Sequence, residues 1–414
     1  MENSAATARE EKEGSSEGGL SAQSMKEGKT MSRRKKKSFR YFLPKFGCMK
    51  LDDDVSRDDG GSFDVEANSG EKNQPPTHLV VMVNGIIGSA EDWKYAAYQL
   101  ARAYPNDVIV HCSESNASKL TFDGIDVMGT RLANEVISVV SRHPALQKIS
   151  FVGHSLGGLV ARYAVAKLYQ QDSIREKSGE GKEEDSGNEP RICLEEKTRA
   201  SICGLEPMNF ITVATPHLGS RGHRQVPMFC GIYNMEIFAM RTSWLFGPTG
   251  KHLFLCDNED GESPLLLRMT KDSEELMFIS ALKLFKRRVA YANVHFDHIV
   301  GWSSSSLRRR NELPKRRSLL RNAKYPHIVY EQQSNTGNAQ ELPLGVKVMR
   351  RRRTHDMEET MIRGLTGLSW ERVDVNFGGS SQRFLAHNTI QVQHYCINSH
   401  GADVIQHMID NFAL

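Results

Sequence analysis

The ten residues ISFVGHSLGG, at positions 149–158, decide the fold of this chain. An apolar run at 149–152 leads directly into a G-x-S-x-G pattern at 153–157, and helical spacing of apolar residues follows. A strand that turns into a helix within so few residues holds the central Ser155 in strained backbone at the helix N-terminus, with its hydroxyl clear of the sheet. The stretch therefore predicts a nucleophile elbow.

The composition is that of a globular protein with polar appendages. Of 414 residues, 39% are hydrophobic and 25% are charged, and the net charge of +4 is too small to imply a partner. Seven cysteines without a C-x-x-C pair favour a reducing compartment. No stretch approaches the ~20 apolar residues of a membrane span, and no apolar signal core is present at the N-terminus. We expect a cytoplasmic protein with one catalytic domain.

The first 75 residues are rich in Glu, Ser, Gly and Lys and are predicted to be a disordered tail. Within it, residues 33–48 interleave basic residues with four aromatic side chains. This pattern suits peripheral association with an anionic membrane surface, and Cys48 is a candidate for palmitoylation there. A solvated linker or a nuclear-import-like run remains an equal alternative.

Two further polar segments interrupt the remaining domain, residues 76–414. Residues 171–200 are predicted to be a surface loop. Residues 303–360 form a basic insertion, with thirteen Lys or Arg against three Glu between 308 and 353. This run has few aromatic residues and no recognisable binding module, so we expect a loop or a membrane-facing patch, and no nucleic acid partner.

Apolar strand-like runs alternate with helical patterns from residue 77 onward. Several runs are apolar on both faces, which is typical of buried strands in a parallel sheet. This alternation predicts an α/β fold, a doubly wound, mostly parallel sheet with helices on both faces and its chemistry beyond the carboxyl ends of the strands. The candidate strands are residues 78–83, 108–112, 149–152, 210–214, 289–294 and 373–377.

The turn after the first core strand, Asn84-Gly85-Ile86-Ile87-Gly88, is a candidate oxyanion site. Its glycine allows close approach, and the backbone N–H of Ile86 is then a donor to the reacting oxygen. The N–H of Leu156, directly after the serine, would be the second donor. A simple tight turn is the alternative interpretation.

For the acid of a triad in the order Ser, Asp, His, the stretch YANVHFDHIV at 291–300 offers Asp297, where a late core strand ends. Asp257, Asp260 and Asp272 lie in polar stretches and are expected to be solvated. The histidines on either side of Asp297 lack a further ligand cluster with suitable spacing, so we expect no metal and no cofactor.

Fifteen histidines compete for the role of base. His154 is predicted to point away from the serine hydroxyl, and both it and His217, in VATPHLG, are candidates for the site wall, as is Asn84. After Asp297, His387 follows the last strand and its Gly-Gly turn, which favours it as the base. The remaining candidates are His394, His400 and His407, the last of which falls on an amphipathic helical pattern.

These motifs together resemble the putative serine esterase family (DUF676) of α/β-hydrolases, in its plant-type form. The matching pieces are HLVVMVNGIIGSAEDW, FVGHSLGGLVARYA, NFITVATPHLGS, TGKHLFLCD, NVHFDHIVGW and AHNTIQV, spanning residues 77–414. The resemblance implies Ser155 as nucleophile, Asp297 as acid and His387 as base. Family members usually carry a histidine where this chain has Asn84, so activity is expected to survive, weakened or with a shifted substrate preference.

Residues 218–285 are predicted to hold a cap or lid, because they contain many apolar side chains between Phe229 and Phe246. An apolar cap favours an acyl chain, hence a lipase or carboxylesterase; core packing is the alternative. The expected function is hydrolysis of carboxylic esters, with lipid acyl esters as the substrate. A silent hydrolase fold acting as a membrane-recruited scaffold, or an acyltransferase, remains open.

Overall fold

The computed structural model describes residues 64–65, 75–172, 199–220, 246–258, 261–333 and 350–414. An eight-stranded sheet forms the centre of this part of the chain, in the order β1-β3-β2-β4-β7-β8-β10-β9. The six inner strands are mutually parallel, and the two edge strands run antiparallel to their neighbours. The inner strands are β2 His78–Val83, β3 Val108–Cys112, β4 Lys148–His154, β7 Glu206–Val213, β8 Arg287–Asn293 and β10 Glu371–Val375.

All six strands predicted from the sequence are present. They are almost wholly buried, as expected for strands covered on both faces. Along β2, alternate side chains enter two different cores: Leu79 and Val81 pack into one, Val80 and Met82 into the other. The structure is therefore an α/β-hydrolase sheet with a hydrophobic core on each side.

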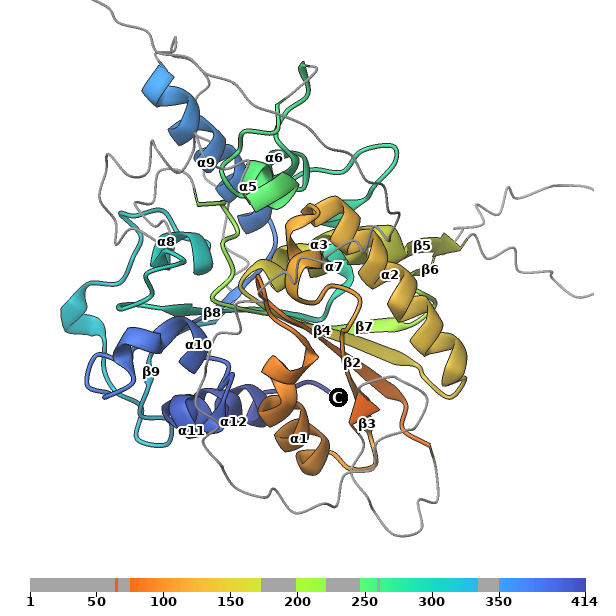
Figure 1. Cartoon of the computed structure of the whole chain (residues 1–414), viewed down its shortest axis with the longest axis horizontal. Helices are drawn as coiled ribbons and strands as arrows, with labels where there is room; N and C mark the ends of the chain where they lie inside the picture. The colour runs from red at the N-terminus through yellow and green to blue at the C-terminus, as the bar shows by residue number, and fades with distance from the viewer. Residues whose placement is uncertain (1–63, 66–74, 173–198, 221–245, 259–260, 334–349) are drawn as a thin grey trace, which may run out of the picture. The chain divides into compact units, whose positions relative to one another are not determined.

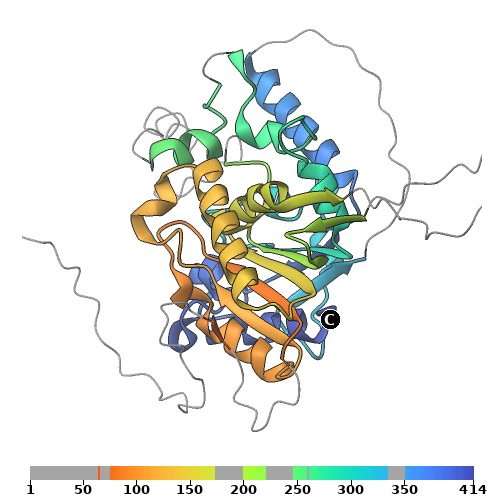
Figure 2. The same ribbon diagram turned by 90° about the vertical axis from the view of Figure 1, so that its right-hand side faces the viewer.

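Figure 1 shows how the helices divide between the faces of the sheet. α1 (Lys94–Ala103) and α12 (Ala402–Asp410) pack on one face, and α2 (Ile125–Arg142), α3 (Leu156–Leu168) and α7 (Phe278–Leu284) on the other. Nearly every side chain of α3 is buried, as expected for a helix that is apolar all round. Figure 2 shows α2 and α3 from the side, lying together against the sheet.

Shorter elements fill the connections. The 3-10 helices are η1 Ala90–Trp93, η2 Ser118–Phe122, η5 Arg316–Ser318, η6 Arg383–Leu385 and η7 Ser399–Gly401. The remaining α-helices are α5 Gly247–Leu253, α6 Leu265–Arg268, α8 Trp302–Ser305, α9 Arg350–Thr366, α10 Ala386–Thr389 and α11 Tyr395–Asn398.

Two strands fall where the sequence predicted a tail or a loop. β1 (Asp64–Val65) lies within the tail predicted to be disordered and pairs with β3, where Asp64 meets His111. β9 (Ile328–Gln332) lies within the basic insertion 303–360 and completes the opposite edge of the sheet. Only its first two side chains are buried, which is why its sequence does not resemble a core strand.

The last residues of the basic insertion form the start of α9, which continues beyond the insertion, buries Met361, Ile362 and Leu365 and contacts α6. Three of its cations have carboxylate partners: Arg308 with the buried Asp374, Arg309 with Glu359, and Lys324 with Asp410. Parts of the described insertion therefore form regular elements, and three of its cations are paired with carboxylates.

Other predicted segments lie largely outside the described residues. These include the basic-aromatic segment 33–48, most of the insertion 171–200, and the cap residues from 221 to 245. The insertion is bounded by β5 (Tyr169–Asp172) and β6 (Arg199–Ile202), which pair antiparallel as a separate two-stranded sheet. Within the described ranges, none of the helices has the length and apolarity needed to cross a membrane.

Candidate active site

Ser155 lies at the turn between β4 and α3, in the strained backbone that the sequence predicted. Its φ of 52° and ψ of −124° are outside the ordinary regions for a residue with a side chain. A Cβ at Gly153 would lie 2.6 Å from Gly158 Cα, and one at Gly157 would overlap the carbonyl oxygen of Val83. Both glycines are therefore required by close approach, and together they make the elbow possible.

His387 is brought to the serine by α10, in the connection that follows β10. Its Nε2 lies 3.0 Å from Ser155 Oγ, within hydrogen-bonding distance. The backbone of His387 is held in turn, because His154 Nε2 donates to its carbonyl oxygen over 2.7 Å. His154 thus lies beside the serine but faces the base, and the two imidazole rings are 4.7 Å apart.

Asp297 completes the chain of contacts from the loop after β8. Its Oδ2 accepts a hydrogen bond from His387 Nδ1 at 3.0 Å, while its Oδ1 accepts from the backbone N–H groups of Ile299 and Val300. The carboxylate is almost fully buried, with 3% of its side chain exposed. A buried carboxylate with so many donors has a fixed orientation toward the imidazole.

The charges of the site are set by these contacts. Burial alone would raise the pKa of Asp297, but the nearby charge of His387 and the hydrogen bonds to the carboxylate outweigh it and lower that pKa. Burial, and then the positive charge of His387, lower the pKa of His154 to about 3. Asp297 is therefore ionised and His154 neutral at physiological pH.

Asn293, at the end of β8, supports the site but was not singled out from the sequence. Its Nδ2 donates to Asp297 Oδ2 at 2.9 Å and to the carbonyl oxygen of Ala386 at 3.2 Å. It therefore ties the acid to the helical turn that carries the base. Its place at the end of a predicted core strand was the available signal, since polar residues at such ends face the site.

The turn after β2 lies against the nucleophile, as its sequence suggested. A Cβ at Gly85 would come within 3.1 Å of Ser155 Cβ, so only glycine fits comfortably there. Among the residues that the structure describes, neither the N–H of Ile86 nor that of Leu156 donates to another group. Both are thus available as the donors expected of an oxyanion site.

Asn84 occupies the position where a histidine was expected from the family resemblance. It is buried, and its Nδ2 donates to the carbonyl oxygens of Gly85 at 3.1 Å and Asn116 at 3.0 Å. Its contacts are thus with the backbone of the turn and of the next connection. Asn84 therefore holds the turn in place through its Nδ2 group and has no titratable ring.

The other predicted histidines lie elsewhere. His217 is fully buried, 3.0 Å from Thr212 Oγ1 and with its ring against Trp370, so its described contacts are with the core and not with Ser155. His407 is also buried and bonds to Tyr291. His400 contacts Ser380. In the described ranges, no group of three or more His, Cys, Asp or Glu side chains is arranged to bind a metal.

Chemically, the arrangement suits nucleophilic attack by Ser155. An imidazole within reach of the hydroxyl can take its proton, and a buried carboxylate behind that imidazole can stabilise the resulting cation. The serine is also at the N-terminal end of α3, where the helix dipole favours developing negative charge.

Comparisons with known proteins agree with this chemistry. The model of the putative serine esterase family (DUF676) matches residues 73–307, which is more than half of the chain. This span includes Ser155 and Asp297 and ends before His387. Two relatives from Saccharomyces cerevisiae are named putative lipase YDL109C and putative lipase ROG1.

The first is 29% identical over 239 residues, covering 56% of this chain and 30% of that protein. The second is 30% identical over 238 residues, covering 56% and 29%. The chain thus matches less than a third of the length of either relative.

A solved lipase from Bacillus licheniformis, in its propeptide form, is 13% identical, with a TM-score of 0.32 and coverage of 56% of this chain and 39% of that one. A likeness of this size carries no argument about activity, whereas the family match extends over the elbow and the acid loop. The chain belongs to the putative serine esterase family (DUF676) and has the α/β-hydrolase fold.

Proposed function

We propose that this protein hydrolyses carboxylic esters of lipids through an acyl-enzyme on Ser155. The observation that carries the proposal is the chain of two 3.0 Å contacts, from Ser155 Oγ to His387 and from His387 to Asp297. The family to which the chain belongs and the names of its relatives support a hydrolase acting on esters.

The proposed reaction follows from this geometry. His387 takes the proton of Ser155 as its oxygen attacks the ester carbonyl, and the N–H groups of Ile86 and Leu156 hold the oxyanion. The imidazolium then gives its proton to the departing alcohol. A water molecule, deprotonated by the same imidazole, attacks the acyl-enzyme and releases the carboxylic acid and free Ser155. Asp297 keeps the proton on Nδ1 throughout.

Exposed apolar residues around the serine support a lipid as the substrate. Ile87, beside the proposed donor Ile86, is 65% exposed, and Phe384, three residues before His387, is 62% exposed. Leu120 and Leu385 are also exposed, and Leu120 adjoins Thr121, which bonds to Ile87. Exposed apolar side chains close in the sequence to the site residues favour contact with an acyl chain.

The experiment is hydrolysis of p-nitrophenyl esters of increasing acyl length by the wild type and by Ser155→Ala. We expect the wild type to prefer medium or long chains and the variant to lose activity by about 10³-fold or more, because the nucleophile is absent. A fluorophosphonate probe should label the wild type alone. Full activity of the variant would refute the proposal, and a wild type that neither turns over nor labels would indicate a silent fold.

Products distinguish hydrolysis from acyl transfer. With a lipid ester and a competing alcohol present, a hydrolase releases mainly the free acid, whereas an acyltransferase releases mainly the new ester. Predominant transfer would replace the proposed reaction while keeping the same residues in the same roles.

We also propose that the protein associates peripherally with anionic membranes. The basic-aromatic segment 33–48 is the main support for this. The second basic run, 308–353, offers less free charge than its sequence suggested, because Arg308, Arg309 and Lys324 are paired with carboxylates.

A further inference from the structure

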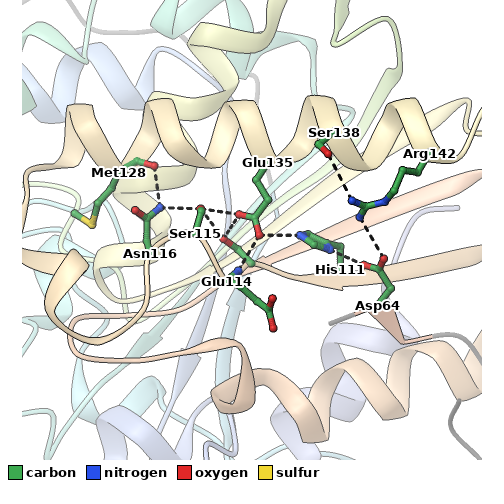
Figure 3. Close-up of polar contacts among 10 residues, drawn as sticks. Asp64, His111, Glu114, Ser115, Asn116, Met128, Glu135, Ser138 and Arg142 are labelled. Carbon is green, nitrogen blue, oxygen red and sulfur yellow. Dashed lines mark hydrogen bonds and ion pairs between the residues drawn. The ribbon is translucent and has the colours of Figure 1, made fainter. Parts of the chain in front are cut away.

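A partly buried carboxylate outside the proposed triad, Glu135 on α2, collects four hydrogen bonds, and 15% of its side chain is exposed. It accepts from Ser113 Oγ at 2.6 Å, Ser115 Oγ at 2.7 Å and the backbone N–H of Glu114 at 2.8 Å, all in the connection after β3. His111 Nε2 lies 3.1 Å from its other side. Figure 3 shows His111, Glu114 and Ser115 around the carboxylate, so Glu135 fixes the start of this connection to α2.

The same connection, residues 113–121, is what the turn at 84–88 rests on. Asn84 Nδ2 donates to the carbonyl oxygen of Asn116, and Ser118 N–H donates to the carbonyl oxygen of Gly88 over 2.9 Å. The N–H of Ile87 donates to Thr121 Oγ1, also over 2.9 Å. We call residues 113–121 the platform; its three contacts reach both ends and the middle of the turn.

The platform is in turn braced by side chains. Asn116 Nδ2 donates to Ser115 Oγ at 3.3 Å and to the carbonyl oxygen of Met128 on α2 at 2.9 Å (Figure 3). A continuous path of polar contacts therefore runs from Glu135 through Ser115 and Asn116 to Asn84, which lies next to the glycine that touches Ser155.

The turn needs such support because it is strained. Ile87 has a φ of 59°, and this left-handed conformation is rare for a β-branched residue. Strain of this kind persists only where the surrounding structure fixes the backbone. The proposed donor, the N–H of Ile86, lies between this strained residue and Gly85, so its direction depends on the contacts on either side.

We infer that Glu135 is a positioning residue that orients the oxyanion turn 84–88 through the platform 113–121. The inference rests on the proposed function, because it concerns a donor used in ester hydrolysis. Glu135 touches neither Ser155 nor His387 and acts through Ser115, Asn116 and Asn84. Its effect is expected in the transition state, where the oxyanion forms, more than in ground-state binding.

Glu135→Gln tests this inference with little change of shape. The amide has one acceptor oxygen and an NH₂ group, so it cannot accept from all four donors that surround the carboxylate. We expect kcat to fall by about 10- to 100-fold, which is less than the roughly 10²- to 10³-fold loss in kcat that follows removal of one oxyanion donor. KM is expected to change by less than about threefold. Rates are expressed per serine titrated to completion with a fluorophosphonate, which removes the contribution of misfolded protein.

Asp123→Asn is the matched control. Asp123 follows the platform and pairs with Arg131, one turn before Glu135 on the same helix, but it has no contact with the turn 84–88. The control loses the same charge and a different link between this connection and α2, a partly exposed ion pair. Its kcat is expected to stay within about twofold of the wild type, because such ion pairs contribute little.

Ser115→Ala provides a second variant should Glu135→Gln fail to fold. It removes one bond to the carboxylate and the bond from Asn116, and we expect a kcat loss of roughly 3- to 10-fold with KM again little changed. Unchanged kcat per titrated site in a folded variant would overturn the inference, as would an equal loss in Asp123→Asn. If the wild type itself had no esterase activity, the proposed function would be refuted. That result differs from the two outcomes that overturn the inference about Glu135.

Discussion

The two oxygens of Asp297 have different partners, and this asymmetry determines what an amide would do in their place. Oδ1 faces two backbone N–H groups, those of Ile299 and Val300, so only an oxygen is accepted there. In Asp297→Asn the NH₂ group must then occupy the Oδ2 position, where it faces His387 Nδ1 and also displaces the hydrogen bond from Asn293 Nδ2. That contact requires Nδ1 without its proton, which moves the proton to Nε2, where it blocks acceptance from Ser155.

We therefore expect Asp297→Asn to lower kcat by about 10⁴-fold while leaving the fold intact, because the imidazole is held as the wrong tautomer. The measurement is steady-state hydrolysis of a soluble ester, with thermal unfolding as the control for structure. A loss below about tenfold in a folded variant would mean that Asp297 does not orient the base.

At the scale of elements, β1 is attached to the sheet by charge as well as by its backbone. Asp64 Oδ1 lies 2.5 Å from His111 Nδ1, and Glu135 lies on the other side of the ring. Arg142, also on α2, faces Asp64. Burial lowers the pKa of His111, but the hydrogen bonds to Asp64 and Glu135 outweigh burial and raise it to about 9. His111 is thus a cation between two carboxylates at neutral pH.

This arrangement predicts a pH dependence of stability. A group whose pKa is raised on folding contributes its full stabilisation of the folded state when the pH is below its unfolded-state pKa, about 6.5. This contribution disappears as the pH rises through the folded-state pKa, about 9. We expect the difference in unfolding free energy between the wild type and His111→Gln to be about 1–3 kcal/mol near pH 6 and to shrink toward pH 10. Urea titrations across this range measure it. A difference independent of pH would indicate that His111 is neutral.

The sequence predicted the strands whose two faces are both buried. It did not predict the strands that depend on contacts with residues distant in the sequence. Several of the inner strands are continuous apolar runs, and the elbow, the acid loop and the base loop each follow a predicted inner strand. β1 depends on the pairing of Asp64 with His111, and β9 on the neighbouring β10, so neither has a local signal. Glu135 was missed for the same reason, because its partners lie 20–24 residues away, and the link from Asn293 to Ala386 spans 93 residues.

At the scale of the whole molecule, the basic-aromatic segment 33–48 is expected to determine membrane association. Deleting residues 33–48 should reduce sedimentation with phosphatidylserine-containing vesicles, because basic residues near such a surface contribute about 1 kcal/mol each. Turnover of a soluble short-chain ester should be unchanged, since the segment lies outside residues 73–307, which match the family.

Neutral phosphatidylcholine vesicles and raised salt serve as controls for this deletion, since electrostatic attraction is screened beyond about 10 Å at 0.1 M salt. Equal sedimentation of the full and shortened chains with anionic vesicles would exclude the segment as the attachment point.

The ribbon of β5 and β6 has a practical consequence. Asp172 and Arg199 are register partners, so the ends of residues 173–198 leave from neighbouring backbone positions on a sheet separate from the main one. The free-energy cost of closing a flexible loop between two fixed ends rises only slowly with its length, by about 0.6 kcal/mol for each doubling. A fluorescent reporter spliced into this insertion would leave the central sheet uninterrupted, which makes the insertion a suitable position for a label.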